Sequence, residues 1–219
     1  MKKITIFICI VALVLSLCGC TSEKKDYENV SKVECHYFVG ESDSYYVTLT
    51  AGSKEDPFVI DGWAGKLYSY AKLTLEVKSG YADEYNYQIA IGEEGFSGTF
   101  VDEIVGGNLT AEFSPSELTE LSYKIIISHG DKSEEIYLES VITDDMIKWN
   151  EAKAIAAKEL SQNITEMQSE ISDNYEVYIK FVYDKDNGVG SWYVAYSSED
   201  DLCAVLIDPT SGDITAKRM

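Results

Sequence analysis

The hydrophobic residues between positions 32 and 142 recur at every second position, in short runs separated by polar turns. Val33, Cys35, Tyr37 and Val39 form the first run. The same alternation recurs over residues 45–51, 73–77, 85–91, 96–101, 109–113, 123–128 and 136–142. This period is typical of strands with one buried face, and many short strands between turns are typical of an antiparallel β-sandwich. We therefore predict a β-sandwich over residues 32–142.

The pattern changes at residue 143, where helix-forming residues replace the alternation. One face of the predicted helix carries Trp149, Ala152, Ile155, Ala156 and Leu160, at steps of three and four. The helix can begin at residues 143–145 or at residues 149–150. Residues 161–174 are polar and are predicted to form a loop, with one helical turn near residue 166 as the alternative.

Alternation returns over residues 175–183, 192–196 and 202–207, and a short edge strand is predicted from Asp213. One helix followed by an antiparallel meander defines a small α+β domain over residues 143–219. The predicted fold class is therefore mainly β, with a β-sandwich followed by this α+β domain.

Two regions resemble known families. Residues 118–123 resemble the start of a late strand in immunoglobulin-like and fibronectin-like domains. The helix and the turn at residues 207–214 resemble a PepSY domain, through Ile147, Glu151-Ala152, Ile155-Ala156 and Ile207-Asp208-Pro209-Thr210-Ser211-Gly212. Lys148 and Ser211 depart from the usual PepSY pattern. The resemblance implies a non-catalytic role in peptide binding or protease inhibition, and it supplies no catalytic residues.

The first nineteen residues have the layout of a secretory signal. Lys2 and Lys3 precede an apolar run over residues 4–17, which as a helix would rise about 21 Å, less than the roughly 30 Å of a hydrocarbon core. The ending Leu17-Cys18-Gly19-Cys20 resembles a bacterial lipobox. That resemblance implies cleavage before Cys20, diacylglycerol on its thiol, a tether over residues 20–31, and an extracytoplasmic protein held at the cell membrane.

The chain is strongly acidic, with 18 basic and 38 acidic residues and a net charge of −20. Loss of the leader removes two lysines and no acidic residue, which makes the charge more negative. Such a field repels nucleic acid and anionic headgroups, so nucleic acid is excluded as a partner. The acidic residues are spread along the chain and maintain solubility, although they can also attract basic protein surfaces.

Two cysteines remain after the leader and the lipidated residue are set aside. Cys35 and Cys203 can form a disulfide, since exported proteins fold in an oxidising compartment. Each also stands in a strand-like apolar run, where a cysteine is often a small buried hydrophobic residue. Both interpretations remain open at this point.

Sixteen tyrosines and three tryptophans give the chain many candidates for aromatic contacts. Exposed aromatic side chains on strands can stack on sugars or anchor a protein partner, whereas buried ones serve packing. The candidate binding aromatics are Tyr45, Tyr46, Tyr68, Tyr70, Trp192 and Tyr193.

The sequence contains no recognisable catalytic or metal-binding constellation. Asp184 and Asp186 suggest a calcium loop, but Ala195 occupies the position where an EF-hand needs glutamate, so a hairpin turn is expected instead. His36 and His129 have no second ligand at zinc spacing. We therefore expect no catalytic residue, no metal and no cofactor.

These observations lead to two functional hypotheses. The first is a membrane-anchored, non-enzymatic lipoprotein that binds an envelope or secreted protein or peptide and can restrain a protease. The alternative is a surface lipoprotein that binds a carbohydrate or small solute. A purely architectural role is also compatible with the acidic surface.

Overall fold

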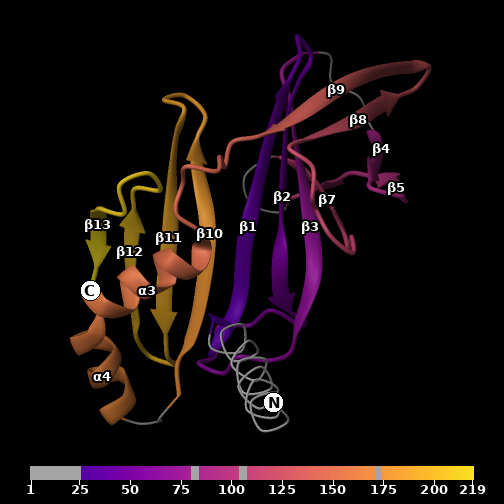
Figure 1. Ribbon diagram of the computed structural model, residues 1–219. Coiled ribbons are helices and arrows are strands. Elements are labelled where there is room, and N and C mark those ends of the chain that lie inside the picture. The colour runs from indigo at the N-terminus through magenta and orange to yellow at the C-terminus, as the bar shows by residue number, and fades with distance from the viewer. Residues whose placement is uncertain (1–25, 80–83, 104–107, 171–173) are drawn as a thin grey trace, which may run out of the picture.

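The computed structural model describes residues 26–79, 84–103, 108–170 and 174–219, and the fold of these residues is mainly β, as the alternation predicts (Figure 1). The strands are β1 (Val30–Glu41), β2 (Tyr45–Glu55), β3 (Leu67–Val77), β4 (Asn86–Ile91), β5 (Glu94–Thr99), β6 (Val101–Asp102), β7 (Leu109–Phe113), β8 (Ser122–His129), β9 (Lys132–Ser140), β10 (Glu176–Asp184), β11 (Val189–Ser197), β12 (Leu202–Ile207) and β13 (Ile214–Arg218). The helices are α3 (Trp149–Glu159) and α4 (Ser161–Glu170).

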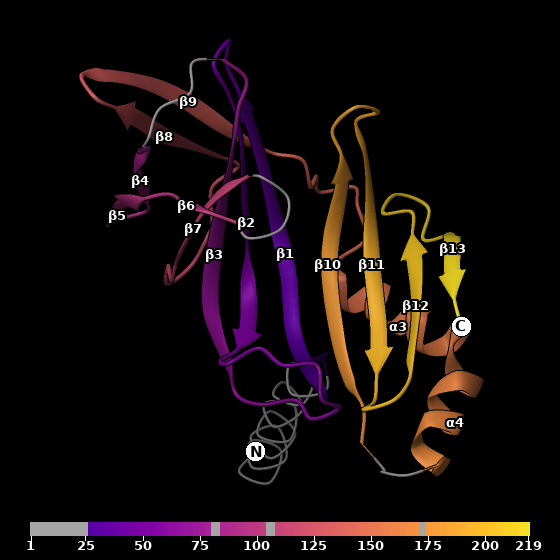
Figure 2. The ribbon, with the colours of Figure 1, turned by 180° about the vertical axis from the view of Figure 1, so that it is seen from behind.

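Strand β1 connects the two regions that the sequence pattern separates. The sheet runs in the order β13-β12-β11-β10-β1-β2-β3-β7-β6, and Figure 2 shows β10 beside β1 from behind. The first half of β1 pairs in parallel with β10, with Val33 opposite Ile179. The second half pairs antiparallel with β9, with Phe38 opposite Ser140. One strand therefore belongs to both parts of the structure.

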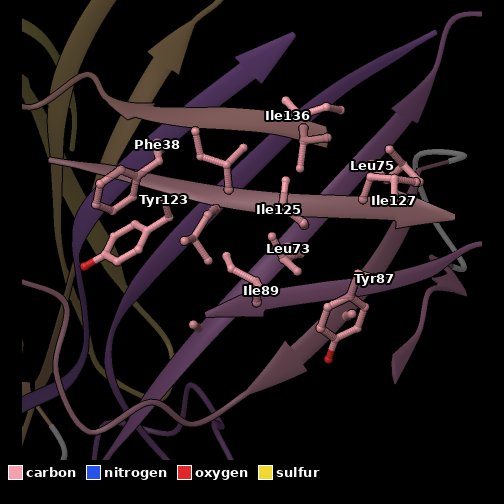
Figure 3. Close-up of a cluster of buried hydrophobic side chains, with 14 of the residues drawn as sticks. Phe38, Leu73, Leu75, Tyr87, Ile89, Tyr123, Ile125, Ile127 and Ile136 are labelled. Atoms are coloured by element: carbon pink, nitrogen blue, oxygen red, sulfur yellow. The ribbon is translucent and has the colours of Figure 1, made fainter. Parts of the chain in front are cut away.

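The larger hydrophobic core lies between two groups of strands. Strand β8 pairs with β4 on one side and with β9 on the other, and these strands lie across β1, β2 and β3 (Figures 1 and 3). Figure 3 shows side chains from both groups pointing toward one another, among them Phe38, Leu73, Ile89, Tyr123 and Ile125. Each side chain of this size contributes about 1.5–3 kcal/mol when it is fully buried. Burial of the alternating apolar face therefore stabilises this arrangement.

A second core lies beneath helix α3. Ala152 and Ala156 are fully buried against β10, β11 and β12, because their small side chains allow the helix to approach the sheet closely. Trp192 is fully buried in this core, and its indole N–H donates to the Ile147 carbonyl at 2.9 Å. The helix begins after Lys148, the N-cap residue, whose amide donates to the Glu151 carboxylate at 2.8 Å.

Residues 161–170 form helix α4, which corrects the loop predicted for these positions and is longer than the single turn near residue 166 given as the alternative. Helix α4 begins directly after Leu160, and the Ile164 amide donates to the Leu160 carbonyl at 2.9 Å. Ile164 and Met167, three residues apart, pack against the second core. Only these two residues of α4 are hydrophobic, too few to produce a helical period that the sequence pattern could reveal.

Candidate functional site

A groove of about 500 Å³ lies on the face of β1, β2 and β3 that is turned away from the larger core. Its position follows from strand geometry, because successive side chains of a strand point to opposite faces. In β2, Val47, Leu49 and Ala51 enter the core, so Tyr46 and Thr50 face the groove. The lining residues are Glu34, Tyr37, Tyr46, Thr48, Thr50, Lys72, Thr74, Glu76, Glu103, Asn108 and Lys185.

Threonine hydroxyls occupy the floor of the groove. Thr48 and Thr74 are directly opposite each other in the β2–β3 ladder, and Thr50 lies two residues along β2 on the same face. A hydroxyl both donates and accepts hydrogen bonds. The floor therefore offers three neighbouring groups that can pair with either polar group of a peptide backbone.

Two tyrosines form an aromatic side of the groove. The Tyr37 ring lies 5.8 Å from the ring of Tyr183 in β10, so this side is continuous with the second core. Burial, together with the neighbouring Tyr37 and Tyr183, raises the pKa of Tyr46 to about 12. The Lys185 ammonium lies 4.9 Å from the centre of the Tyr46 ring. The phenol of Tyr46 is therefore protonated at neutral pH and can donate a hydrogen bond.

The charged groups that line the groove take part in ion pairs. The Lys72 ammonium lies 2.9 Å from the Glu103 carboxylate. The ammonium of Lys185, on the β10–β11 hairpin, forms an ion pair with the carboxylate of Glu76 on β3. The Glu34 carboxylate accepts a hydrogen bond from Tyr70 and is 2.8 Å from the Lys32 ammonium. The Lys185–Glu76 and Lys72–Glu103 pairs are partly exposed, and ion pairs of this kind contribute at most about 1 kcal/mol each, so a charged ligand can exchange with them.

The six candidate aromatics do not form one surface. Trp192, Tyr45 and Tyr70 are buried, so an exposed binding role is wrong for these three. Tyr70 lies beneath the ammonium of Lys54, which is 4.7 Å from the ring centre. Because burial and the Glu34 carboxylate raise its pKa, Tyr70 is an un-ionised donor.

The other three candidates lie on different parts of the surface. Tyr46 lines the groove, Tyr68 is 48 % exposed near the start of β3, and Tyr193 is half-buried with its ring centre 5.7 Å from that of Tyr178. The structure adds groove residues that the sequence analysis did not select, namely Tyr37, Thr48, Thr50 and Thr74. Their signal in the sequence is the polar side of the alternation in β2 and β3.

Cys35 and Cys203 are free thiols, which corrects the disulfide alternative. Cys35 lies on β1 and Cys203 on β12, and β10 and β11 stand between these strands. Three strand spacings of about 4.8 Å separate them, whereas a disulfide requires Cα atoms within about 7 Å. Burial raises the pKa of the Cys35 thiol to about 11. Cys20 lies outside the described residues.

The acidic hairpin and the histidines take part in local contacts. The Asp184 carboxylate accepts hydrogen bonds from the Asp186 and Asn187 amides, which hold the β10–β11 turn. His36 stacks near Phe38 with ring centres 6.4 Å apart, and burial lowers its pKa. Within the ranges that the structure describes, no three His, Cys, Asp or Glu side chains are grouped in a way that could hold a metal ion.

Comparisons with known proteins give no assignment. No protein-family model matches this chain, and no significant match is found among curated proteins or solved structures. Of the helices in the described ranges, none is long and apolar enough to cross a membrane.

Proposed function

We propose that this chain is an extracytoplasmic lipoprotein, anchored by a lipid on Cys20, which binds an extended peptide segment of another protein without catalysing a reaction. The observation that carries this proposal is the groove on β1, β2 and β3, whose volume of about 500 Å³ falls within the usual range for ligand sites. The lipobox-like ending of the leader supports the anchor.

The chemistry of the groove favours a peptide. An extended backbone presents amide donors and carbonyl acceptors at short intervals, and hydroxyls can satisfy both. Thr48, Thr50 and Thr74 supply such hydroxyls, while Tyr37 and Tyr46 add ring surface for side chains of the peptide. The exposed ion pairs at the sides can exchange with charged side chains of the ligand.

We further propose that residues 32–142 are an immunoglobulin-like sandwich and that residues 143–219 are a PepSY-like module. Support for the first is the core enclosed between two groups of strands. The packing of α3 across β10, β11 and β12 supports the second. A PepSY-like module makes a secreted protease one partner worth testing.

The carbohydrate alternative has less support. Sugar binding by stacking needs exposed rings that share one surface, and three of the six candidate aromatics are buried. Of the remaining three, only Tyr68 is exposed, and it does not line the groove, whereas Tyr46 lines the groove but is half-buried.

Selection of peptides from a random library by binding to the purified protein tests the groove. Thr50→Trp fills the groove with an indole, and Ser97→Trp places the same side chain on the exposed strand β5. We expect Thr50→Trp to weaken binding of selected peptides at least tenfold and Ser97→Trp to leave it unchanged. Equal binding by both variants, or failure to select any peptide, would contradict the proposal.

Two further measurements test the anchor and the alternative ligand. Mass spectrometry of the native protein should show a chain that starts at Cys20 and carries diacylglycerol, and Cys20→Ala should release the protein from the membrane fraction. A glycan array should show no binding. Inhibition of a thermolysin-type protease by the wild type, lost in Thr50→Trp, would identify the partner class.

A further inference from the structure

The loop between β2 and β3, residues 56–66, presents a cluster of exposed apolar side chains. Val59 is 47 % exposed, Ile60 is 48 % exposed and Trp63 is 63 % exposed. Tyr68 follows at the start of β3. We call these four residues the loop patch. The other large exposed hydrophobic residues in the described ranges are spread over separate strands and segments, so this patch is the concentrated one.

The loop is held in place by buried carboxylates. Glu176 at the start of β10 is fully buried, and its Oε1 accepts the Gly62 amide proton at 3.0 Å. Glu55 at the end of β2 is also buried and accepts a hydrogen bond from the Gly65 amide. The Trp63 amide donates to the Asp61 carboxylate at 2.9 Å. These bonds fix the conformation in which the apolar side chains point to solvent.

The loop patch lies beside the point at which the chain enters the fold. Val177 donates its amide proton to the Asn29 carbonyl at 2.6 Å, and the neighbouring residue Glu176 accepts from Gly62. The start of β1 and the β2–β3 connection lie at the same end of the sheet (Figure 1). Cys20 precedes Asp26 by six residues, which even when fully extended span only about 20 Å.

We propose that the loop patch rests in the headgroup region of the membrane to which Cys20 is attached, with Trp63 at the interface. This inference rests on the lipid anchor proposed above. Tryptophan and tyrosine favour the membrane interface because one end of each side chain is apolar and the other polar. The tether confines the loop near the bilayer, so a weak contact is sufficient at the resulting high effective concentration.

The charges near the patch indicate how it meets the membrane. Asp61 belongs to the loop, and the Ser198–Glu199 backbone of the acidic β11–β12 turn lies next to Gly62. Lys66 lies between Trp63 and Tyr68 in the sequence, and its ammonium lies 4.9 Å from the centre of the Tyr68 ring. Because acidic groups outnumber Lys66 around the patch, the contact depends on apolar side chains and does not depend on anionic lipid.

Quenching of tryptophan fluorescence by brominated lipid tests this contact. The native protein is purified from a membrane fraction and reconstituted in phosphatidylcholine vesicles whose acyl chains carry bromine. The chain has two other tryptophans, Trp149 and Trp192, so the Trp63 signal is the difference between the wild type and Trp63→Phe. We expect bromine to quench the wild type at least twice as strongly as Trp63→Phe.

A matched control moves the exposed indole to the other end of the sheet. Tyr137 is 60 % exposed on β9, and its carbonyl lies close to Gly40, near the far end of β1. Trp63→Phe combined with Tyr137→Trp should be quenched no more than Trp63→Phe alone. Iodide in the aqueous phase should quench Tyr137→Trp in vesicles and should leave the Trp63 signal protected.

Flotation of the vesicles separates failure of this contact from failure of the anchor. If the wild-type protein floats with the vesicles but bromine quenches it no more than Trp63→Phe, the contact is overturned and the anchor stands. Iodide accessibility of Trp63 in floating vesicles would overturn the contact in the same way and favour a protein partner. Failure to float would overturn the anchor and the contact together.

Discussion

The close approach of β1 and β2 at Gly52 yields a sharp prediction about stability. A Cβ atom at Gly52 would lie 1.9 Å from the Val33 carbonyl oxygen and 2.9 Å from its carbon. Backbone atoms cannot move aside as a flexible side chain can, so Gly52→Ala must push the two strands apart. Gly52 stands opposite Glu34, next to the register shift between Glu34 and His36.

The expected cost follows from the ladder around this position. A separation of about 1 Å would break two or three hydrogen bonds, each worth about 0.5–1.5 kcal/mol. Residual strain in the packed core adds about 1–3 kcal/mol. We therefore expect Gly52→Ala to lower the free energy of unfolding by about 3–5 kcal/mol, a large part of the 5–15 kcal/mol typical of a folded protein.

Urea denaturation monitored by tryptophan fluorescence measures this change, with the difference taken from the midpoint at constant m value. Gly95→Ala in the exposed strand β5 is the matched control, because a Cβ there meets nothing within 4 Å. The control should be unchanged or more stable by up to about 1 kcal/mol. A free energy of unfolding for Gly52→Ala within 1 kcal/mol of the wild-type value would refute the close approach.

Two further predictions concern buried polar groups. At pH 8 Cys35 and Cys203, whose thiol pKa values burial raises, should react slowly with Ellman's reagent in the native protein. In the mature form proposed above, these two thiols should react after denaturation without reductant, whereas no reaction would indicate a disulfide and contradict the strand order. Glu176→Ala leaves the Gly62 amide unpaired and should lower the free energy of unfolding by about 1–3 kcal/mol. Glu176→Gln retains an acceptor oxygen and should stay within about 1 kcal/mol of the wild type in the same urea assay. An equal loss of stability in both variants would show that the charge of Glu176, and not its hydrogen bond, stabilises the loop.

The strands and helix α3 could be predicted because hydrophobic residues occupy most positions on their buried faces. Apolar residues occupy every second position over residues 175–183, which cover most of β10, and apolar residues at steps of three and four around Ala152 and Ala156 indicate α3. The pairing of β1 with β10 could not be predicted, because alternation shows which face of a strand is buried and does not identify the neighbouring strand.

The sequence pattern also could not predict which of the candidate aromatic residues share one surface. Adjacent residues of a strand point to opposite faces, so Trp192 and Tyr193 cannot both lie on one surface. In β2, Tyr45 enters the larger core while Tyr46 lines the groove. The groove itself depends on which polar faces the topology brings together, and that arrangement arises only in the folded chain.

The double pairing of β1 has a consequence for how the chain matures after synthesis. The Ser31 hydroxyl donates to the carbonyl of Val177, 146 positions further along the chain. If the chain crosses the membrane from its N-terminus, the edge of β1 remains open until almost all of it has emerged. Contacts of such long sequence separation form slowly, and open strand edges promote aggregation. A truncated product that lacks β10 would therefore be a target for quality-control proteases and not a smaller working version of the protein.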